Sequence, residues 1–305
     1  MFQRILVPLD GSHLAESVLP AAVYLAEHFN ATIILFHAVE VDAPATVHGQ
    51  RHLMSAPEAQ AYLDETAARI ARPDITIEKN VHPAEPARVA HSIIEHVTEL
   101  NADLIVLCAH GSGDLRGVLV GNIAQQVIQR GTTPVFFIRP ADDQAVPPFK
   151  CEKILVPLDS TPNHEPALFI ASELAEKCGA MLHLLTVVPT AGTLSAERAA
   201  TGMLLPTTMT AVLELAQRGA VEYLQATTAR LLASGTPTAA TVARGDPPSA
   251  ILSAVEREGA DVIVMATHGR GNFDAFWSGS VTPKVLSKTN VPVLLVRVMT
   301  EEVAR

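Results

Sequence analysis

Short aliphatic runs alternate with amphipathic stretches along the whole chain. In the first half, the apolar runs predict β-strands over residues 5–9, 32–37, 76–80, 104–108 and 135–138. Apolar positions with helical spacing predict helices over residues 14–29, 56–72, 86–100 and 122–130. Strands that are apolar on both faces and alternate with helices are typical of a parallel sheet covered by helices on both sides.

This order of elements occurs twice. The run Ile-Leu-Val-Pro-Leu-Asp ends at Asp10 and again at Asp159, and His-Gly ends at Gly111 and again at Gly269. The paired segments keep the same order, which chance similarity between apolar strands does not produce. The second half differs mainly by a longer insertion between residues 189 and 207. The pattern therefore predicts one whole domain duplicated in tandem.

The boundary between the copies is visible in composition. Residues 140–150 lack apolar periodicity and are rich in proline and aspartate, which is typical of a linker. We predict domains at residues 1–140 and 151–305, joined by a linker at 141–150. The predicted fold class is α/β, with two tandem doubly wound domains that each contain a five-stranded, mainly parallel sheet.

Composition and net charge indicate a globular chain and argue against some kinds of binding partner. The 305 residues are 48% hydrophobic and 18% charged, which is typical of a globular chain. A net charge of −10 argues against nucleic acid or an anionic membrane surface as partner. The three cysteines show no paired spacing, so we expect a reducing compartment and no disulfide framework. The sequence shows no signal-peptide pattern and no membrane-length apolar stretch, so we expect a cytoplasmic protein without membrane insertion.

Ligands of such sheets bind outside the carboxyl ends of the strands. There the copies carry Asp10-Gly-Ser and Asp159-Ser-Thr, which either cap a helix only or also contact a ligand. The matching positions favour an added ligand role. After the fourth strand of the second copy, Gly269 is followed by nine residues and then by Gly279-Ser280. Glycine backbone at a helix start offers free N–H groups to an anion such as phosphate.

At these residues the chain resembles the universal stress protein family, as two family domains in tandem with the Rossmann-like, adenine nucleotide α-hydrolase-like fold. The family's nucleotide-binding form carries Gly-x-x-Gly, nine residues, and then Gly-Ser/Thr. The second copy matches except that Ala266 replaces the first glycine. The resemblance implies that ATP or another adenine nucleotide, with or without Mg²⁺, binds there. It implies these contact residues in the second copy: Pro157, Asp159, Val187, Gly245, Thr267, His268, Gly269, Arg270, Gly279, Ser280 and Val281.

The first copy departs further from the family pattern. Cys108 stands where the family uses glycine, Asn122 replaces Ser/Thr, and Ala84 stands where the second copy has Gly245. These changes crowd the pocket or remove donors, so we expect a weak or empty first site and a stronger second site. The first-site contacts implied by the resemblance are Asp10, Ala38, Gly111, Gly121 and Asn122.

The resemblance implies a stress-response regulatory protein with slow hydrolysis at most, because no general base or arginine clamp is evident in the sequence. We therefore assign no catalytic residue and no metal ligand. Two alternatives stay open: a protein-interaction module without nucleotide, and a slow ATPase or nucleotide hydrolase on the same fold. By analogy with family dimers, we expect residues 135–138 and 293–296 to pair the domains into an intramolecular pseudo-dimer. A homodimer and an unidentified protein partner are further expectations.

Overall fold

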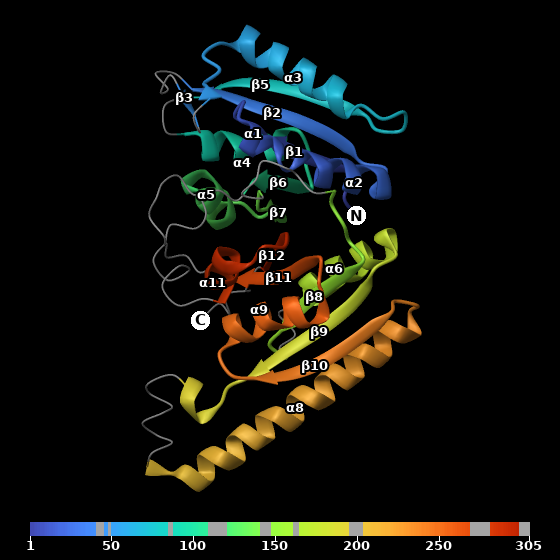
Figure 1. The fold of residues 1–305 in the computed structure, drawn as a ribbon, viewed down its shortest axis with the longest axis vertical. Coiled ribbons are helices and arrows are strands. Elements are labelled where there is room, and N and C mark those ends of the chain that lie inside the picture. Colours follow the sequence, from blue (N-terminus) through green and yellow to red (C-terminus); the bar gives the residue numbers. More distant parts are fainter. Residues whose placement is uncertain are drawn as a thin grey trace, which may run out of the picture. The chain divides into compact units, whose positions relative to one another are not determined.

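The computed structural model describes residues 1–40, 46–47, 50–84, 88–108, 121–140, 148–160, 165–194, 204–268 and 281–298, and the structural statements below concern these residues. The chain divides into two compact units, one of residues 1–150 with 292–297 and one of residues 151–291 with 298–305. In each unit, strands alternate with helices, as Figure 1 shows. The predicted α/β fold with a mainly parallel sheet is confirmed.

The sheet of the first unit has five parallel strands in the order β7-β6-β1-β2-β5. The strands are β1 (Arg4–Pro8), β2 (Thr32–Glu40), β5 (Ile77–Ala84), β6 (Leu104–Cys108) and β7 (Val135–Ile138). Ile5, Leu6 and Val7 are completely buried, as expected for a central strand covered on both faces. Residues of β12 (Val293–Val298) that belong to this unit pair antiparallel with β7. The predicted pseudo-dimer stays a prediction.

The helices of the first unit are α1 (His13–Glu16), α2 (Leu19–Phe29), α3 (Ala56–Ile70), α4 (Val89–Glu99) and α5 (Asn122–Arg130). The prediction of one helix over residues 14–29 is wrong, because a turn at Ser17 and Val18 interrupts the helix. Pro20 lies in the first turn of α2 and has no N–H to donate to a preceding turn, so a new helix begins there. Helix α3 lies along β5 at the edge of the sheet (Figure 1).

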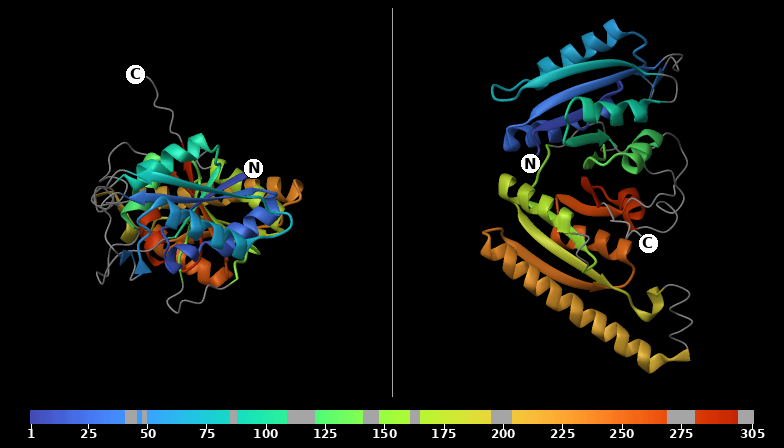
Figure 2. Two further views of the ribbon diagram at one scale, coloured as in Figure 1. Left: turned by 90° about the horizontal axis from the view of Figure 1, so that it is seen from above. Right: turned by 180° about the vertical axis from the view of Figure 1, so that it is seen from behind.

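The second unit repeats the arrangement with the strand order β10-β9-β8-β11. Its strands are β8 (Lys153–Leu158), β9 (Met181–Val188), β10 (Thr238–Arg244) and β11 (Val262–His268). Its helices are α6 (Glu165–Cys178), η2 (Ala191–Thr193), α8 (Pro206–Ala233), α9 (Pro247–Glu258) and α11 (Val281–Lys288). Helix α8 has 28 residues, whereas its counterpart α3 has 15, and it lies along β10 (Figure 2).

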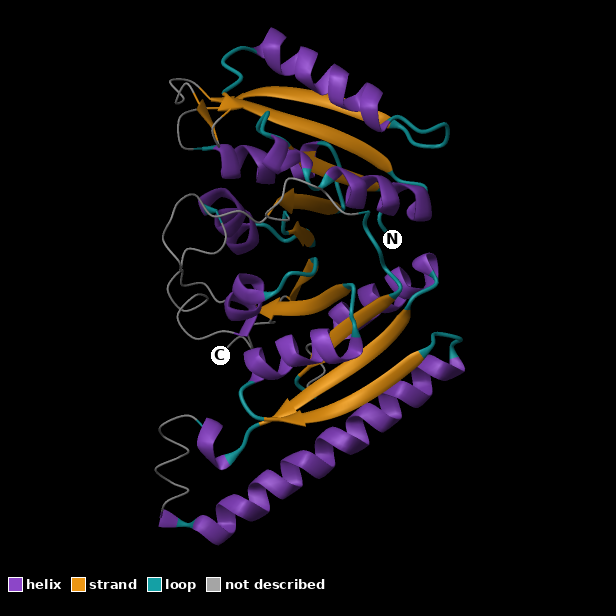
Figure 3. Cartoon of the chain, viewed as in Figure 1, coloured by secondary structure: helices purple, strands orange, loops and turns teal. Residues whose placement is uncertain are grey.

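One element was not predicted from the sequence. Strands β3 (Thr46–Val47) and β4 (Gln50–Arg51) form a short antiparallel pair beside the carboxyl ends of β2 and β5, as Figure 3 shows. This pair brings residues 50–53 next to the candidate site described below. None of the described helices combines the length and apolarity that a membrane span requires.

Candidate functional site

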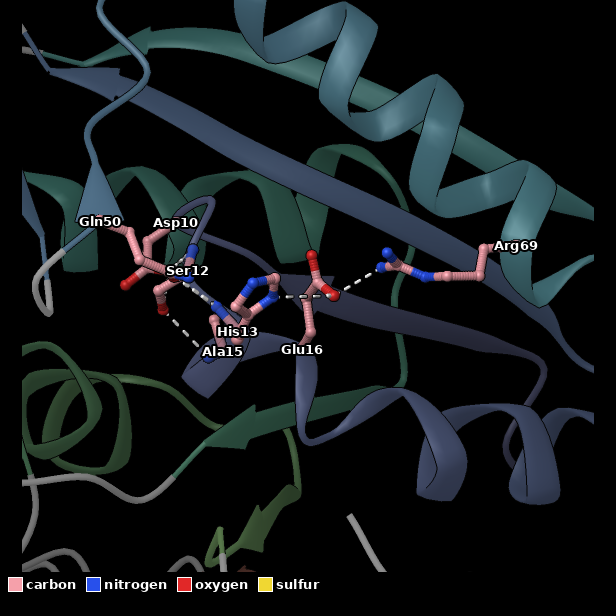
Figure 4. A network of polar contacts seen from close by, with 7 residues as sticks. All are labelled: Asp10, Ser12, His13, Ala15, Glu16, Gln50 and Arg69. Atoms are coloured by element: carbon pink, nitrogen blue, oxygen red, sulfur yellow. Dashed lines mark hydrogen bonds and ion pairs between the residues drawn. The ribbon is translucent and has the colours of Figure 1, made fainter. Parts of the chain in front are cut away.

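The turn after β1 is built around Asp10 and Ser12 (Figure 4). The Asp10 carboxylate accepts hydrogen bonds from the Ser12 backbone N–H at 2.9 Å and from the Ser12 hydroxyl at 2.6 Å. The Ser12 oxygen in turn accepts from the N–H of Ala15 at 3.1 Å and caps α1. Ser12 is therefore the cap, and Asp10 orients it, so the capping interpretation applies to Asp10 only indirectly.

The residue between them shows what the turn requires. Gly11 has φ +87°, and Ser160 at the matching position of the second copy has φ +62°. Left-handed backbone costs a non-glycine residue roughly 1–2 kcal/mol. The Ser160 hydroxyl oxygen is also buried without a hydrogen-bond partner. The second copy thus keeps the turn after β8, next to Asp159, at an energetic cost that the first copy avoids.

A buried histidine lies at the carboxyl end of β2. His37 is 1% exposed, and its Nδ1 lies 2.7 Å from the carbonyl oxygen of Leu9. A carbonyl can only accept, so Nδ1 carries the proton and Nε2 of the neutral ring is an acceptor. Burial lowers the pKa of His37, and nearby His52 opposes its charged form further. Among the residues that the structure describes, Nε2 has no hydrogen-bond partner, which is unusual for a buried polar atom.

The second copy carries a polar side chain at the same place. Strand pairing aligns Pro8 with Phe36 and Pro157 with Leu185, so Thr186 is the counterpart of His37. Thr186 is 4% exposed, and its hydroxyl oxygen is also buried without a hydrogen-bond partner in the described part of the chain. Both copies therefore hold an unsatisfied polar atom at an equivalent point near the carboxyl end of the strand.

In the first unit, this point borders a cavity of about 280 Å³ at the carboxyl ends of β1, β2 and β6. Its wall includes Asp10, His37, Ala38, His52, Cys108, Gly121 and Asn122. The structure therefore brings together the four described residues that the resemblance implied as first-site contacts. Only the backbone of Ala84 is described. Gly111 lies outside the described residues. The cavity volume is near the lower end of the range for small-molecule sites.

Helix α5 opens at this cavity. Gly121 is its N-cap with extended ψ of 151°, and no side chain caps the first turn. Free N–H groups and the positive end of the helix dipole at such a start favour an anion. Cys108 also lines the cavity, with its sulfur 3.5 Å from the Ser17 hydroxyl, and burial raises its pKa to about 12. We expected Cys108 to crowd the pocket, but a cavity remains beside it among the described residues.

Gln50 and Leu53 lie against the turn after β1, and His52 between them lines the cavity. The Gln50 side-chain oxygen accepts a hydrogen bond from the His13 N–H at 2.7 Å, as Figure 4 shows. An ideal Cβ on Gly11 would approach the Leu53 side chain to 3.1 Å, so glycine also permits this close contact. His52 is buried in the cavity wall. The sequence analysis missed His37, His52 and Thr186; the available signal was a polar residue at matched positions inside two apolar runs.

The second-copy residues are described only in part. Three of them, Pro157, Val187 and Thr267, are the next-to-last residues of parallel strands, and Asp159 directly follows β8. Val281 begins α11, and only the backbone of His268 is described. The remaining predicted contacts outside the described residues are Gly269, Arg270, Gly279 and Ser280.

Gly245 ends the turn before α9 with φ +131°, a conformation that side chains rarely adopt. No heavy atom lies within 4 Å of an ideal Cβ there, so the backbone angle rather than crowding explains the glycine. The next residue, Asp246, caps α9 through the Ser249 N–H at 3.2 Å. Hydrogen bonds from Ser249 lower the pKa of Asp246, and Lys284 and Lys288 of α11 lower it further. Within the described chain, no three potential ligand side chains gather into a metal site.

Comparison with known proteins places this geometry in a family. The model of the universal stress protein family matches residues 1–139 and again residues 150–297. A universal stress protein of Mycolicibacterium smegmatis is 25% identical over 311 residues, which covers 96% of each chain. Universal stress protein YxiE of Bacillus subtilis is 27% identical over 151 residues, which covers 46% of this chain and all of that one.

A solved structure shows the same architecture over the full length. The crystal structure of a universal stress protein from Archaeoglobus fulgidus matches with a TM-score of 0.69 at 19% sequence identity. The match covers 98% of this chain and 97% of that one. At this identity the likeness supports the fold alone.

Proposed function

Since this chain belongs to the universal stress protein family, we propose that it is a stress-response regulator that binds adenine nucleotides at the carboxyl ends of its parallel strands. The observation that carries the proposal is the unsatisfied Nε2 of His37 beside the 280 Å³ cavity, matched by the Thr186 hydroxyl in the second copy. A buried polar atom without a partner is costly unless a ligand supplies that partner.

The chemistry of these atoms favours a ligand with donors. Neutral Nε2 of His37 can only accept, so the ligand group that meets it must carry an N–H or O–H. The exocyclic amine of adenine and the hydroxyls of ribose are such groups. The Thr186 hydroxyl can donate or accept, so the second site is less restrictive at this point.

The phosphates would bind at the starts of helices α5 and α11. The uncapped first turn of α5 opens at the cavity, and Val281 begins the corresponding helix α11. Helix N-termini bind phosphate through free N–H groups and the helix dipole. The proposed backbone contacts at Gly269, Gly279 and Ser280 follow from the motif that the chain shares with the family's nucleotide-binding form. We expect the second site to bind more tightly than the first, with Mg²⁺ as an optional bridge between phosphate oxygens.

Calorimetric titration of the full-length chain with ATP, ADP and AMP tests the proposal. We expect Gly279→Val to weaken binding far more than Gly121→Val, because the valine branches block phosphate approach at the stronger site. Gly219→Val is the matched control, since Gly219 lies within α8 with open space around its Cβ position. Equal effects at Gly279 and Gly121 would refute the asymmetry, and no heat with any of the three nucleotides would refute the proposal.

Two measurements separate the alternatives. A protein-interaction module without nucleotide would carry no adenine nucleotide through purification, which native mass spectrometry detects. A slow hydrolase would release labelled phosphate from ATP at a rate that Gly279→Val abolishes. Turnover that survives this substitution would come from contamination.

A further inference from the structure

Two of the three cysteines meet in the second unit, although they are far apart in sequence. Cys151 lies two residues before β8, and Cys178 is the last residue of α6, three residues before β9. Gly179, with φ +66°, turns the chain from α6 toward β9. Lys153 pairs with Met181, and the Met181 N–H donates to the Glu152 carbonyl at 2.9 Å. The start of β8 and the approach to β9 therefore lie at the spacing of neighbouring strands, about 4.8 Å.

The side chains use this proximity. The pairing of Lys153 with Met181 brings the residues just before the two strands together, and Cys178 is the group that most strongly perturbs the Cys151 thiol, so the two side chains lie close to each other. Cys151 is 1% exposed, whereas Cys178 is partly accessible to solvent. The hydrogen bond with Cys178 and then burial raise the pKa of Cys151 above its ordinary value, and the Asp261 carboxylate acts in the same direction. Cys151 therefore stays a thiol, and Cys178 is the sulfur that a dissolved oxidant can reach.

We propose that Cys151 and Cys178 are an oxidant-sensitive pair that closes reversibly into an intramolecular disulfide. With hydrogen peroxide as oxidant, the Cys178 sulfur attacks one peroxide oxygen and the O–O bond breaks. Cys178 becomes a sulfenic acid, and the other peroxide oxygen leaves as water. The Cys151 sulfur then attacks the Cys178 sulfur, loses its proton, and displaces the sulfenic oxygen as a second water. Two thiols and one peroxide thus become one disulfide and two waters.

The disulfide would link the first residue of the second unit, Cys151, to the last residue of α6, Cys178. It would enclose residues 151–178, which comprise β8, the turn at Asp159 and α6. Closing such a loop restricts the unfolded chain and stabilises the folded domain. The pair lies at the amino end of β8, a strand of six residues that spans roughly 20 Å, and Asp159 follows the opposite, carboxyl end of this strand. The inference therefore does not depend on nucleotide binding.

Cys108 provides an internal comparison. It is buried in the first unit, its sulfur contacts the Ser17 hydroxyl, and no other described cysteine lies beside it. Burial raises its pKa to about 12, which suppresses the reactive thiolate. Under conditions that oxidise the pair, Cys108 should stay reduced.

The test uses the folded full-length chain. The protein is treated with hydrogen peroxide, quenched, unfolded, alkylated with N-ethylmaleimide and digested for mass spectrometry. We expect one cross-linked peptide joining Cys151 to Cys178, alkylated Cys108, and recovery of three alkylated cysteines after dithiothreitol. Thermal unfolding should move to higher temperature on oxidation of the wild type, and Cys178→Ser should show neither the cross-link nor the shift.

Several outcomes would overturn the inference. These are a sulfinic acid on Cys178 with Cys151 still alkylated, cross-links only between separate chains, or disulfides shared equally among the three cysteines. Oxidation of Cys151 in the Cys178→Ser variant would also contradict it, since Cys151 is protected from solvent. Cys151→Ala provides a second variant, in which Cys178 should stop at the sulfenic acid, detectable with dimedone.

Discussion

Thr186→Val should change stability and binding in opposite directions. The Thr186 hydroxyl is buried without a hydrogen-bond partner at the carboxyl end of β9, and valine has nearly the same shape. In the free protein, the substitution removes a desolvated polar group and adds a buried methyl. In the complex, it removes the partner that we expect a ligand donor or acceptor to meet.

The magnitudes follow from the burial of this group. A buried, unsatisfied hydroxyl costs about 1–3 kcal/mol, so the free energy of unfolding of the free protein should rise by that order. For a domain of this size, each kcal/mol moves the melting temperature by about 2–4 °C. Loss of the ligand hydrogen bond should weaken nucleotide binding by about 1–3 kcal/mol, which is roughly 5- to 150-fold in Kd.

Differential scanning calorimetry without ligand and isothermal titration with ATP measure the two quantities. Thr241→Val is the matched control, because Thr241 lies on the adjacent strand and its hydroxyl is 3.0 Å from Nε2 of His183. Valine at position 241 leaves His183 without this partner, so the control should lower the melting temperature and leave binding nearly unchanged.

A lower melting temperature for Thr186→Val would mean that its hydroxyl is already satisfied in the free protein. Unchanged binding with a raised melting temperature would mean that the hydroxyl faces no ligand. Either result would remove the argument that the unpartnered atoms of the two copies mark ligand sites.

Further predictions concern the first unit. Burial places the pKa of His37 in the folded state below that of the unfolded chain, so the unfolded chain binds the proton first below about pH 6.5. Stability should therefore decrease from pH 7 toward pH 5, and urea titrations of His37→Leu should show a flatter profile; an unchanged slope would contradict the assignment. Ser12→Ala should cost about 0.5–2 kcal/mol of unfolding free energy by uncapping the Ala15 N–H, and Ser12→Thr should restore most of it because its hydroxyl can still accept from Ala15 and donate to Asp10. Arg4→Gln should cost about 1 kcal/mol, because Arg4 bonds the half-exposed Glu78 at 2.6 Å; a double-mutant cycle with Glu78→Gln that shows no coupling would assign the loss elsewhere.

Much of the fold follows from periodicity in the sequence. Aliphatic runs locate the central strands because β1 and β6 are buried on both faces, and the duplicated order predicts the second unit from the first. The start of α2 was predictable in principle from Pro20, but the apolar periodicity continues through residues 14–29 and hides the break. The β3–β4 pair is too short to leave a periodic signal.

The site is less accessible from sequence than the fold. The motif glycines predict where phosphate binds, but they say nothing about which side chains remain unsatisfied nearby. The tautomer of His37 depends on the Leu9 carbonyl, which comes near only when β1 and β2 pair. The proximity of Cys151 and Cys178 likewise requires the parallel register of β8 and β9, and no spacing rule for cysteines anticipates it.

The left-handed turn at Gly11 and Ser160 bears on how the duplicated gene has diverged. Serine occupies this position in the second copy at a backbone angle that disfavours it, and the angle remains left-handed as it is at glycine in the first copy. The path of the main chain after the first strand is thus more resistant to drift than the residue that occupies it. An ancestral single-domain protein with glycine at this point would be expected to fold with less local strain than the present second copy.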